Sequence, residues 1–476
     1  MNGKGMYVNP VVAGNYADPS VIRVGEDYYM THTSYKAIPG LIIWHSRDLV
    51  HWAPISAALY EYVGDVWAPE FVHHNGTYYI YFPANRTNWV VTAPTPTGPW
   101  SRPVDLKIKG IDPGHVVGPD GKRYLHMSDG HIVELSEDGL AIAGEPRHVY
   151  DGWRYPDEWV VEGYSMEGPK LRYKDGYYYL NVAVGGTAGP PTSHMVVCSR
   201  SHTPWGPWEH SPYNPVVKTQ SRSERWWSKG HGTLIDSPDG KWYIVYHGYL
   251  NGYHSLGRQT LLEPVEWTED GWYRTIEGIS PDNPIPLPFG EAVKRSRTVD
   301  DRFNGERLGI HWQCNGELPE VHYRQQNGTL TIEGRDDDKI RSPLVFMTTA
   351  PSYEAEVELS FTGAAEGRLL LYYDDNAWMG IGVSAKGARH LRSFKQYAVK
   401  PCYGERVFLR IRHEEHLVFY YYSTDGIHWS RYDKVTDASG FNHNTLGGFL
   451  SLRIGLDAVG EGTVTVHRFQ YRELHS

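Results

Sequence analysis

Short runs of alternating apolar and polar residues follow one another along the whole chain, as in "LIIWHSRD", "HIVELSEDG" and "QTLLEPVEWTEDGWY". A period of two residues is typical of β-strands that bury one face. No stretch shows the apolar period of about 3.6 residues that marks an amphipathic helix. The pattern therefore predicts an all-β protein.

A glycine followed by an aromatic, strand-forming run recurs five times in the first half of the chain. The runs begin at Gly25, Gly76, Gly121, Gly176 and Gly240, with further short strands between them. Units of about 45–60 residues, each with roughly four strands, are the period of propeller blades. We therefore expect a five-bladed β-propeller over residues 1–290. The alternative interpretation is a sandwich of unrelated hairpins.

The chain changes character after the fifth unit. The stretch "SPDNPIPLPFGEAV", from Ser280 to Val293, holds four prolines among its first nine residues, which is typical of a rigid linker. Beyond it, alternating segments such as "YEAEVELSFTG" and "GTVTVHRFQYREL" are separated by turn residues. This pattern predicts a second domain, an antiparallel β-sandwich over residues 291–476.

Composition narrows the classes of partner. The formal charge is -10 and no basic run is present, so we expect neither nucleic acid nor a membrane as a partner. The N-terminal "MNGKGMYVNPVV" lacks the apolar core of a secretory signal. The three cysteines are odd in number and lack metal-ligand spacing, which indicates free thiols and a cytoplasmic location. The sequence does not indicate an oligomeric state.

One ionisable residue precedes each aromatic run at nearly the same distance. These residues are Asp18, Glu70, Asp112, Glu167 and His231, and most have proline or glycine beside them. In a propeller the first strand of every blade lines the central channel, so equivalent positions converge on one mouth of that channel. The repeat therefore predicts a ring of ionisable groups assembled from all five blades.

Several carboxyl groups among many aromatic rings suit acid–base chemistry on a neutral polyol. Mutual repulsion and burial raise the pKa of one carboxyl group while another stays ionised, and glycosidic cleavage needs that division. Aromatic faces offer an apolar wall for a sugar ring. Each residue also has a structural interpretation: Asp18 and Asp112 as turn formers, and His231 as a structural histidine. Their shared phase in the repeat favours a site.

The motifs "NYADPSVIRVGEDYYM", "VWAPEFVHHNGTYYIYF", "IDPGHVVGPDGKRYL", "MEGPKLRYKDGYYYL" and "GHGTLIDSPDGKWYIVYHGY" together resemble glycoside hydrolase family 43. The resemblance covers roughly residues 7–290 with the motifs in order. It implies a five-bladed propeller and an inverting mechanism. By position in these motifs, Asp18 would be the general base, Asp112 the auxiliary acid that orients and tunes the general acid, and Glu167 the general acid.

The same resemblance implies further roles for four residues. Trp67 would form a wall of the subsite for the terminal sugar, and Arg258 would bind substrate hydroxyls. His231 matches a histidine that in many members lies beside a calcium ion or a water cluster. Ile111 precedes Asp112 where some xylosidases carry an aromatic residue, so the wall of the terminal subsite differs there. No cofactor is required for the chemistry.

The second domain resembles the concanavalin-like domain that follows the propeller in many family 43 β-xylosidases, where it can close one side of the pocket. The alternative is an independent carbohydrate-binding module. We expect an exo-acting enzyme on xylo- or arabino-oligosaccharides that releases terminal β-1,4-linked xylose and also acts on α-L-arabinofuranosides. Two alternatives stay open: α-L-arabinofuranosidase as the main activity, and a non-catalytic propeller that binds sugar.

Overall fold

The computed structural model describes residues 5–289, 298–335, 342–393, 395 and 397–474. The chain folds into two compact units. One comprises Met1–Asn251 with Arg258–Val293, and the other comprises Gly252–Gly257 with Lys294–Ser476. Both units consist of β-strands, and the described residues contain one short α-helix, α1 (His443–Leu446). The prediction of an all-β protein is confirmed.

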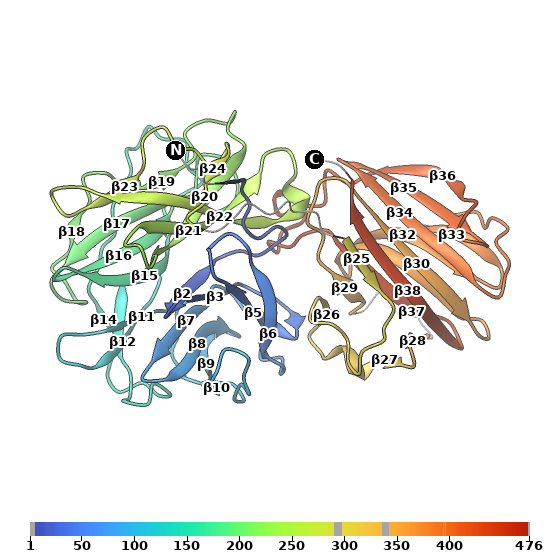
Figure 1. Ribbon diagram of the computed structural model, residues 1–476, viewed down its shortest axis with the longest axis horizontal. Helices are drawn as coiled ribbons and strands as arrows, with labels where there is room; N and C mark the ends of the chain where they lie inside the picture. The colour runs from blue at the N-terminus through green and yellow to red at the C-terminus, as the bar shows by residue number, and fades with distance from the viewer. Residues whose placement is uncertain (1–4, 290–297, 336–341, 394, 396, 475–476) are drawn as a thin grey trace. The chain divides into compact units, whose positions relative to one another are not determined.

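The first unit is a five-bladed β-propeller, as the repeat predicted, and Figure 1 shows its five small sheets. Each blade is an antiparallel sheet in which neighbouring strands follow one another along the chain. The blades are, in order, β2 (Ser20–Val24), β3 (Asp27–Thr31), β5 (Gly40–Ser46) and β6 (Ala53–Leu59); β7 (Glu70–His74), β8 (Thr77–Ala84), β9 (Thr87–Ala93) and β10 (Val104–Asp105); β11 (Gly114–Val117), β12 (Arg123–His126), β13 (His131–Glu134) and β14 (Arg147–His148); β15 (Met166–Lys174), β16 (Tyr177–Val184), β17 (Met195–Ser201) and β18 (Glu209–His210), with β19 (Val217–Lys218) on β17; and β20 (Trp226–Asp236), β21 (Trp242–Leu250), β22 (Arg258–Trp267) and β23 (Tyr273–Thr275).

The five repeated glycines explain why the blades share one form. Each lies in the turn between the first and second strands of its blade, and each has a positive φ, from 65° at Gly25 to 88° at Gly176. This backbone region is open to glycine without a steric penalty. The turn returns the chain along the first strand, and the aromatic run that follows becomes the second strand.

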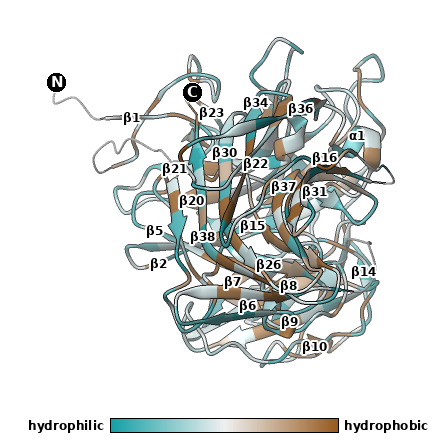
Figure 2. Cartoon of the chain, turned by 90° about the vertical axis from the view of Figure 1, so that its right-hand side faces the viewer, coloured by the Kyte–Doolittle hydropathy of each residue, from teal (hydrophilic) through white to brown (hydrophobic). Residues whose placement is uncertain are grey.

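Apolar faces of neighbouring blades pack together and form the propeller's core. One cluster joins blades two and three through Tyr81, Val90, Leu125 and Val133, all buried. Hydrophobic and hydrophilic residues alternate in colour along the strands in Figure 2. The alternation follows from the pleat, which turns successive side chains to opposite faces. Packing of this kind fixes the position of each first strand, and therefore of the residues that precede it.

Strand β1 (Met6–Tyr7) pairs with β24 (Ile285–Pro286) and ties the two ends of the propeller unit together. The Asn9 side chain adds two hydrogen bonds to the backbone of Leu262 in β22. The proline-rich stretch predicted as a linker thus contributes a strand to the propeller unit. Its last residues, 290–293, lie outside the described residues.

The second unit is a concanavalin-like sandwich of two antiparallel sheets, as predicted. The strands share a core that includes Trp312, Tyr353, Leu369, Tyr420 and Phe469. One sheet has the order β27 (Tyr323–Gln326), β28 (Thr329–Glu333), β38 (Thr463–Glu473), β30 (Tyr353–Phe361), β34 (Val407–Glu414), β35 (Leu417–Ser423), β36 (Ser430–Asp437), with β25 (Thr298–Asp301) on β38, and the other contains β33 (Gly387–Arg392), β32 (Ala377–Ser384), β31 (Glu366–Asp374), β37 (Arg453–Val459), β29 (Leu344–Phe346) and β26 (Trp312–Asn315). Among the described residues, no helix has the length and apolar character needed to cross a bilayer.

Candidate active site

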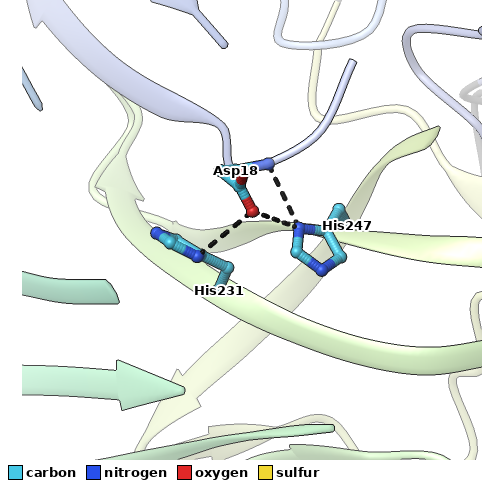
Figure 3. A group of neighbouring side chains, drawn as sticks. All are labelled: Asp18, His231 and His247. Atoms are coloured by element: carbon cyan, nitrogen blue, oxygen red, sulfur yellow. Dashed lines mark hydrogen bonds and ion pairs between the residues drawn. The ribbon is translucent and has the colours of Figure 1, made fainter. Parts of the chain in front are cut away.

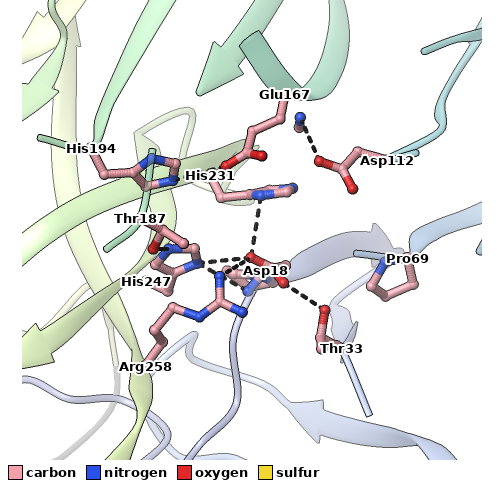
Figure 4. Close-up of polar contacts among 12 residues, drawn as sticks. Asp18, Thr33, Pro69, Asp112, Glu167, Thr187, His194, His231, His247 and Arg258 are labelled. Carbon is pink, nitrogen blue, oxygen red and sulfur yellow. Dashed lines mark hydrogen bonds and ion pairs between the residues drawn. The ribbon is translucent and has the colours of Figure 1, made fainter. Parts of the chain in front are cut away.

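Four blades bring ionisable side chains together where their first strands begin or bend (Figure 4). Asp18 and Asp112 each precede a first strand by two residues, whereas Glu167 lies within β15 and His231 within β20. The backbone is left-handed at Asp18 (φ 56°), Asp112 (φ 56°), His231 (φ 60°) and Gly168 (φ 61°). Such backbone strain in non-glycine residues clusters at functional sites. The structure thus brings Asp18, Asp112, Glu167 and His231 together, as the repeat predicted.

Asp18 is the most heavily bonded of these groups. Its Oδ1 accepts a hydrogen bond from Arg258 Nη1 at 3.1 Å and lies 3.3 Å from His231 Nδ1 and 3.1 Å from His247 Nδ1. Its Oδ2 accepts a hydrogen bond from the Thr33 hydroxyl at 2.5 Å. Figure 3 shows the two histidines on the same carboxylate oxygen. Every oxygen of this buried carboxylate is therefore engaged.

These partners decide the ionisation of Asp18. Burial alone would raise the pKa of its carboxyl group, but the charges of Arg258 and His231 outweigh it and hold the pKa well below its usual value. The guanidinium is itself buried, at 4% exposure, and donates a second hydrogen bond to the Tyr35 hydroxyl at 3.0 Å. Asp18 is therefore a carboxylate at any pH near neutrality.

At Asp112 the effects that raise the pKa outweigh those that lower it, which is the opposite of Asp18. Its side chain is buried, and Oδ2 accepts a hydrogen bond from the backbone N–H of Gly168 at 3.0 Å. Burial raises the pKa of this carboxyl group, and the negative charge of Asp18 adds to the effect, against the lowering effect of His231. Asp112 is thus fixed to the strand that carries Glu167.

Glu167 has the clearest shift of the three acids. Burial raises the pKa of its carboxyl group to about 7, with further contributions from the charges of Asp112 and Asp18. Its Oε1 lies 3.9 Å from Nε2 of His194, a fully buried imidazole whose pKa burial holds well below its usual value. His194 is therefore neutral and adds no positive charge that would lower the pKa of Glu167. A large fraction of Glu167 carries a proton at neutral pH.

Gly168 explains how Glu167 reaches this position. A Cβ atom on Gly168 would lie 2.7 Å from His231 Nε2, so only glycine allows the two strands to approach here. The register of β15 against β16 shifts between Glu167 and Lys170, which is a bulge. Bulges next to active sites re-aim side chains. Both features lie in the motif "MEGP", whose glycine and proline form the bulge immediately after the acid.

Two of the predicted substrate-binding residues connect to this cluster. Arg258 binds Asp18 and Tyr35, and the Tyr35 ring meets the half-buried Trp67 ring edge-on, with centroids 5.4 Å apart. Ile111 is different. Its side chain is 45% exposed and its carbonyl accepts a hydrogen bond from the Ser128 N–H, with no described contact to the carboxyl groups.

Glu70 shares the phase of the other acids but has a different environment. It forms an ion pair with Lys170 at 2.6 Å and accepts a hydrogen bond from the Ser20 hydroxyl at 3.1 Å. It therefore belongs to a polar layer inside the channel, whereas the repeat had predicted it in the ring. A further residue, His247, was missed. Its signal was a histidine inside the apolar run "WYIVYHGY" of the fifth blade.

Asp18, His231 and His247 form the described group whose ligand atoms could surround a metal ion, since these atoms lie within 4.8 Å of one another. Calcium prefers six to eight oxygen ligands, whereas this set offers two imidazole nitrogens and one carboxylate. The guanidinium of Arg258 already binds the same carboxylate oxygen. The donor set therefore does not fit the calcium ion expected near His231.

Comparison with known proteins gives matches over both units. The family described as "Glycosyl hydrolases family 43" matches residues 7–273, and "Beta xylosidase C-terminal Concanavalin A-like domain" matches residues 300–472. The non-reducing end alpha-L-arabinofuranosidase BoGH43B of Bacteroides ovatus is 34% identical over 64% of this chain, which covers 60% of that enzyme. The xylan 1,3-beta-xylosidase of a Vibrio species is 28% identical over 88% of this chain and 89% of its own length.

Solved structures agree with these matches. The GH43 protein BlXynB of Bacillus licheniformis superposes with a TM-score of 0.87 at 28% identity, over 98% of this chain and all of that one. The xylan beta-1,4-xylosidase of Bacillus halodurans superposes with a TM-score of 0.85 at 26% identity, with the same coverage. The likeness therefore extends over both units.

Proposed function

The chain belongs to glycosyl hydrolase family 43, and we propose that it is an inverting exo-glycosidase that releases terminal xylose from β-1,4-linked xylo-oligosaccharides. One observation carries the mechanism: two carboxyl groups of a single buried cluster have opposite pKa shifts. The pKa of Asp18 lies well below its usual value, and that of Glu167 is raised to about 7. At a pH between these two pKa values, Asp18 is ionised and can act as a base, whereas Glu167 is protonated and can act as an acid.

In the proposed reaction, Glu167 gives its proton to the oxygen of the leaving sugar as the glycosidic bond breaks. A water molecule attacks the anomeric carbon from the opposite face and gives its proton to Asp18, so the anomeric configuration inverts. Proton exchange with solvent then restores both groups. Two carboxyl groups supply all of the acid–base chemistry, so the scheme needs no cofactor.

The other residues of the cluster have supporting roles in this proposal. Asp112 keeps the proton on Glu167 through its charge and holds the strand through the N–H of Gly168. Arg258 is fixed by Asp18 and Tyr35 beside the acid cluster and would donate hydrogen bonds to sugar hydroxyls. The Trp67 ring would provide the apolar wall against which the terminal sugar lies.

The relatives support both candidate sugars to different extents. β-Xylosidases from Vibrio and Bacillus subtilis align over 88% and 93% of this chain, whereas the Bacteroides ovatus arabinofuranosidase aligns over 64%. The longer alignments favour xylose. The name of the Bacteroides enzyme specifies the non-reducing end, which supports exo action. α-L-Arabinofuranosidase as the main activity is the second candidate.

The deciding experiment compares kcat/KM on aryl β-xyloside, aryl α-L-arabinofuranoside, β-1,4-xylobiose and β-1,3-xylobiose. We expect kcat/KM to be higher on aryl β-xyloside than on aryl α-L-arabinofuranoside, and higher on β-1,4-xylobiose than on β-1,3-xylobiose. An arabinofuranoside preference above about tenfold, or ~1.4 kcal/mol in transition-state binding, would reverse the choice of sugar and leave the mechanism intact. Binding of xylobiose by calorimetry without hydrolysis of any substrate would instead support a non-catalytic, sugar-binding propeller.

We also propose a cytoplasmic location, supported by the state of the thiols. Cys198, Cys314 and Cys402 are all free and buried, which suits a reducing compartment. Fractionation of the native cells, with activity measured in each fraction, tests this. Activity in the culture medium would contradict it.

A further inference from the structure

A cavity of about 520 Å³ lies inside the propeller and is lined by the first strands of all five blades. Its lining begins two or three residues beyond the members of the acid cluster: at Ser20 after Asp18, at Lys170 after Glu167 and at Thr233 after His231. The proposed glycosidase reaction uses none of the lining side chains. The cavity is therefore a separate feature of the channel.

Five charged side chains line this cavity, three basic and two acidic. Lys170 pairs with Glu70 at 2.6 Å, and Arg23 forms an ion pair with Asp236. Both carboxylates are thus committed to a basic partner, and Arg172 is the third basic group. The charge of the five groups sums to +1.

Arg172 bears that uncompensated charge. Its guanidinium donates hydrogen bonds to two backbone carbonyls, from Nε to Leu234 at 2.8 Å and from Nη2 to Val21 at 3.2 Å. No carboxylate among the described residues forms an ion pair with it. Burial lowers the pKa of Arg172, because the guanidinium has lost part of its hydration. The negative charges of Glu70 and Asp236 act in the opposite direction and favour the guanidinium, but each of these carboxylates forms its ion pair with another base. An anion bound to Arg172 would supply the direct ionic partner that the guanidinium lacks.

Two histidines of the lining do not add to the positive charge. Of the three lining histidines, burial lowers the pKa of His74 and holds the pKa of His115 well below its usual value, so these two are neutral near pH 7. His115 Nε2 accepts a hydrogen bond from Arg123 Nε at 3.1 Å. The cavity is thus polar, its two carboxylates are paired with Lys170 and Arg23, and, among the described residues, Arg172 is the basic group of the lining without an ion pair.

We propose that this channel cavity binds a small oxyanion, a carboxylate or a phosphate, on the guanidinium of Arg172. A planar guanidinium offers several donors, of which Nε and Nη2 are used here, and it matches the geometry of carboxylate and phosphate oxygens. The other charged side chains are already paired, so selectivity for an anion comes from Arg172. The volume accommodates an ion the size of phosphate or a monosaccharide acid.

The test is calorimetric titration of the full chain in a low-salt buffer free of oxyanions. The probes are inorganic phosphate, D-glucuronate, and D-glucose as the uncharged match of glucuronate. We expect one site, a dissociation constant on the order of 1 mM and no glucose binding there. Arg172→Gln should weaken binding at least tenfold. Arg274→Gln, which removes the same charge at an exposed edge strand, should leave it unchanged.

Each outcome decides the proposal. Binding of glucuronate alone identifies a carboxylate ligand, and binding of phosphate alone identifies a phosphate ligand. No binding of either probe overturns the proposal, as does equal binding by wild type and Arg172→Gln. Should Arg172→Gln not fold, Arg172→Lys retains the charge without the planar donors and is expected to weaken binding severalfold. Unchanged binding by that variant overturns the proposal.

Discussion

The backbone N–H of Gly168 donates a hydrogen bond to Asp112 Oδ2 across 3.0 Å. This bond joins the carboxyl group of blade three to the residue that follows Glu167 in blade four. It places the buried Asp112 at a fixed position beside Glu167, and the charge of Asp112 is the second largest cause of the raised pKa of Glu167, after desolvation. The position of the proposed general acid and its pKa thus depend on the same neighbour.

Asp112→Asn tests this dependence. The amide oxygen still accepts the Gly168 hydrogen bond, but the negative charge is lost, so the pKa of Glu167 falls from about 7. The alkaline limb of the kcat/KM profile should move to lower pH, with reduced activity at pH 7. Asp129→Asn, at an acid with 60% side-chain exposure, should leave the profile unchanged. An unmoved limb in Asp112→Asn would show that Asp112 does not tune the general acid.

The wild-type pH profile gives a second prediction. The reaction needs Glu167 protonated and Asp18 ionised. Activity should therefore fall as pH rises through about 7, where Glu167 loses its proton. The acidic limb should lie below the ordinary aspartate range, because the pKa of Asp18 is well below its usual value. Measurements of kcat/KM from pH 3 to 9 check both limbs. A rise in activity above pH 8 would contradict the assignment of Glu167 as the general acid.

The sequence predicted the architecture because local chemistry repeats in every blade. Each glycine with positive φ fixes one turn, and each aromatic run then forms the second strand. The phase of the repeat also located Asp18, Asp112 and Glu167. It failed at Glu70, because Glu70 is the first residue of β7 and does not precede the strand, and because its side chain pairs with Lys170 of another blade. Neither can be derived from spacing alone.

Residues outside the first strands were harder to predict. His247 lies in the second strand of blade five and His194 precedes β17, the third strand of blade four. Their rings stack with centroids 5.2 Å apart. His247 lies beside Asp18 of blade one and His194 lies beside Glu167 of its own blade, so both contacts depend on tertiary structure. A histidine within an apolar run shows that the position is unusual, but the sequence does not show which residue the histidine contacts.

Loss of the proposed general acid should depend on the leaving group. Glu167→Gln keeps the size of the side chain but cannot give a proton. We expect kcat/KM on xylobiose to fall by about 10²–10⁴-fold. An aryl xyloside with an acidic phenol needs little protonation and should lose much less. Equal losses on both substrates, with an unchanged melting temperature, would indicate a role for Glu167 other than protonation.

Replacement of the proposed base should affect both activity and stability. Asp18→Asn tolerates the left-handed backbone, but it leaves the buried Arg258 guanidinium without its carboxylate. We expect kcat to fall by orders of magnitude and the free energy of unfolding to fall by about 3 kcal/mol. Urea denaturation measures the second effect, with Asp129→Asn as the control. A variant with wild-type turnover would refute the role of Asp18 as base.

Stereochemistry provides the remaining prediction. In an inverting enzyme a water molecule lies between the base and the anomeric carbon, which requires carboxyl groups about 6.5–9.5 Å apart, whereas a retaining enzyme has them about 5–5.5 Å apart. Asp18 is bonded to Arg258 and Thr33, so both of its oxygens are committed to other groups. Such a carboxylate suits proton transfer from water better than attack on the sugar.

The proton NMR spectrum of the first turnovers decides between the two mechanisms. Hydrolysis of an aryl β-xyloside should release α-xylose first, and the β anomer should appear only at the rate of spontaneous mutarotation. Glu167→Gln with an activated aryl xyloside is the matched case, because its product should also be α-xylose, formed more slowly. Initial β-xylose from the wild type would mean retention, and Asp18 would then be a nucleophile.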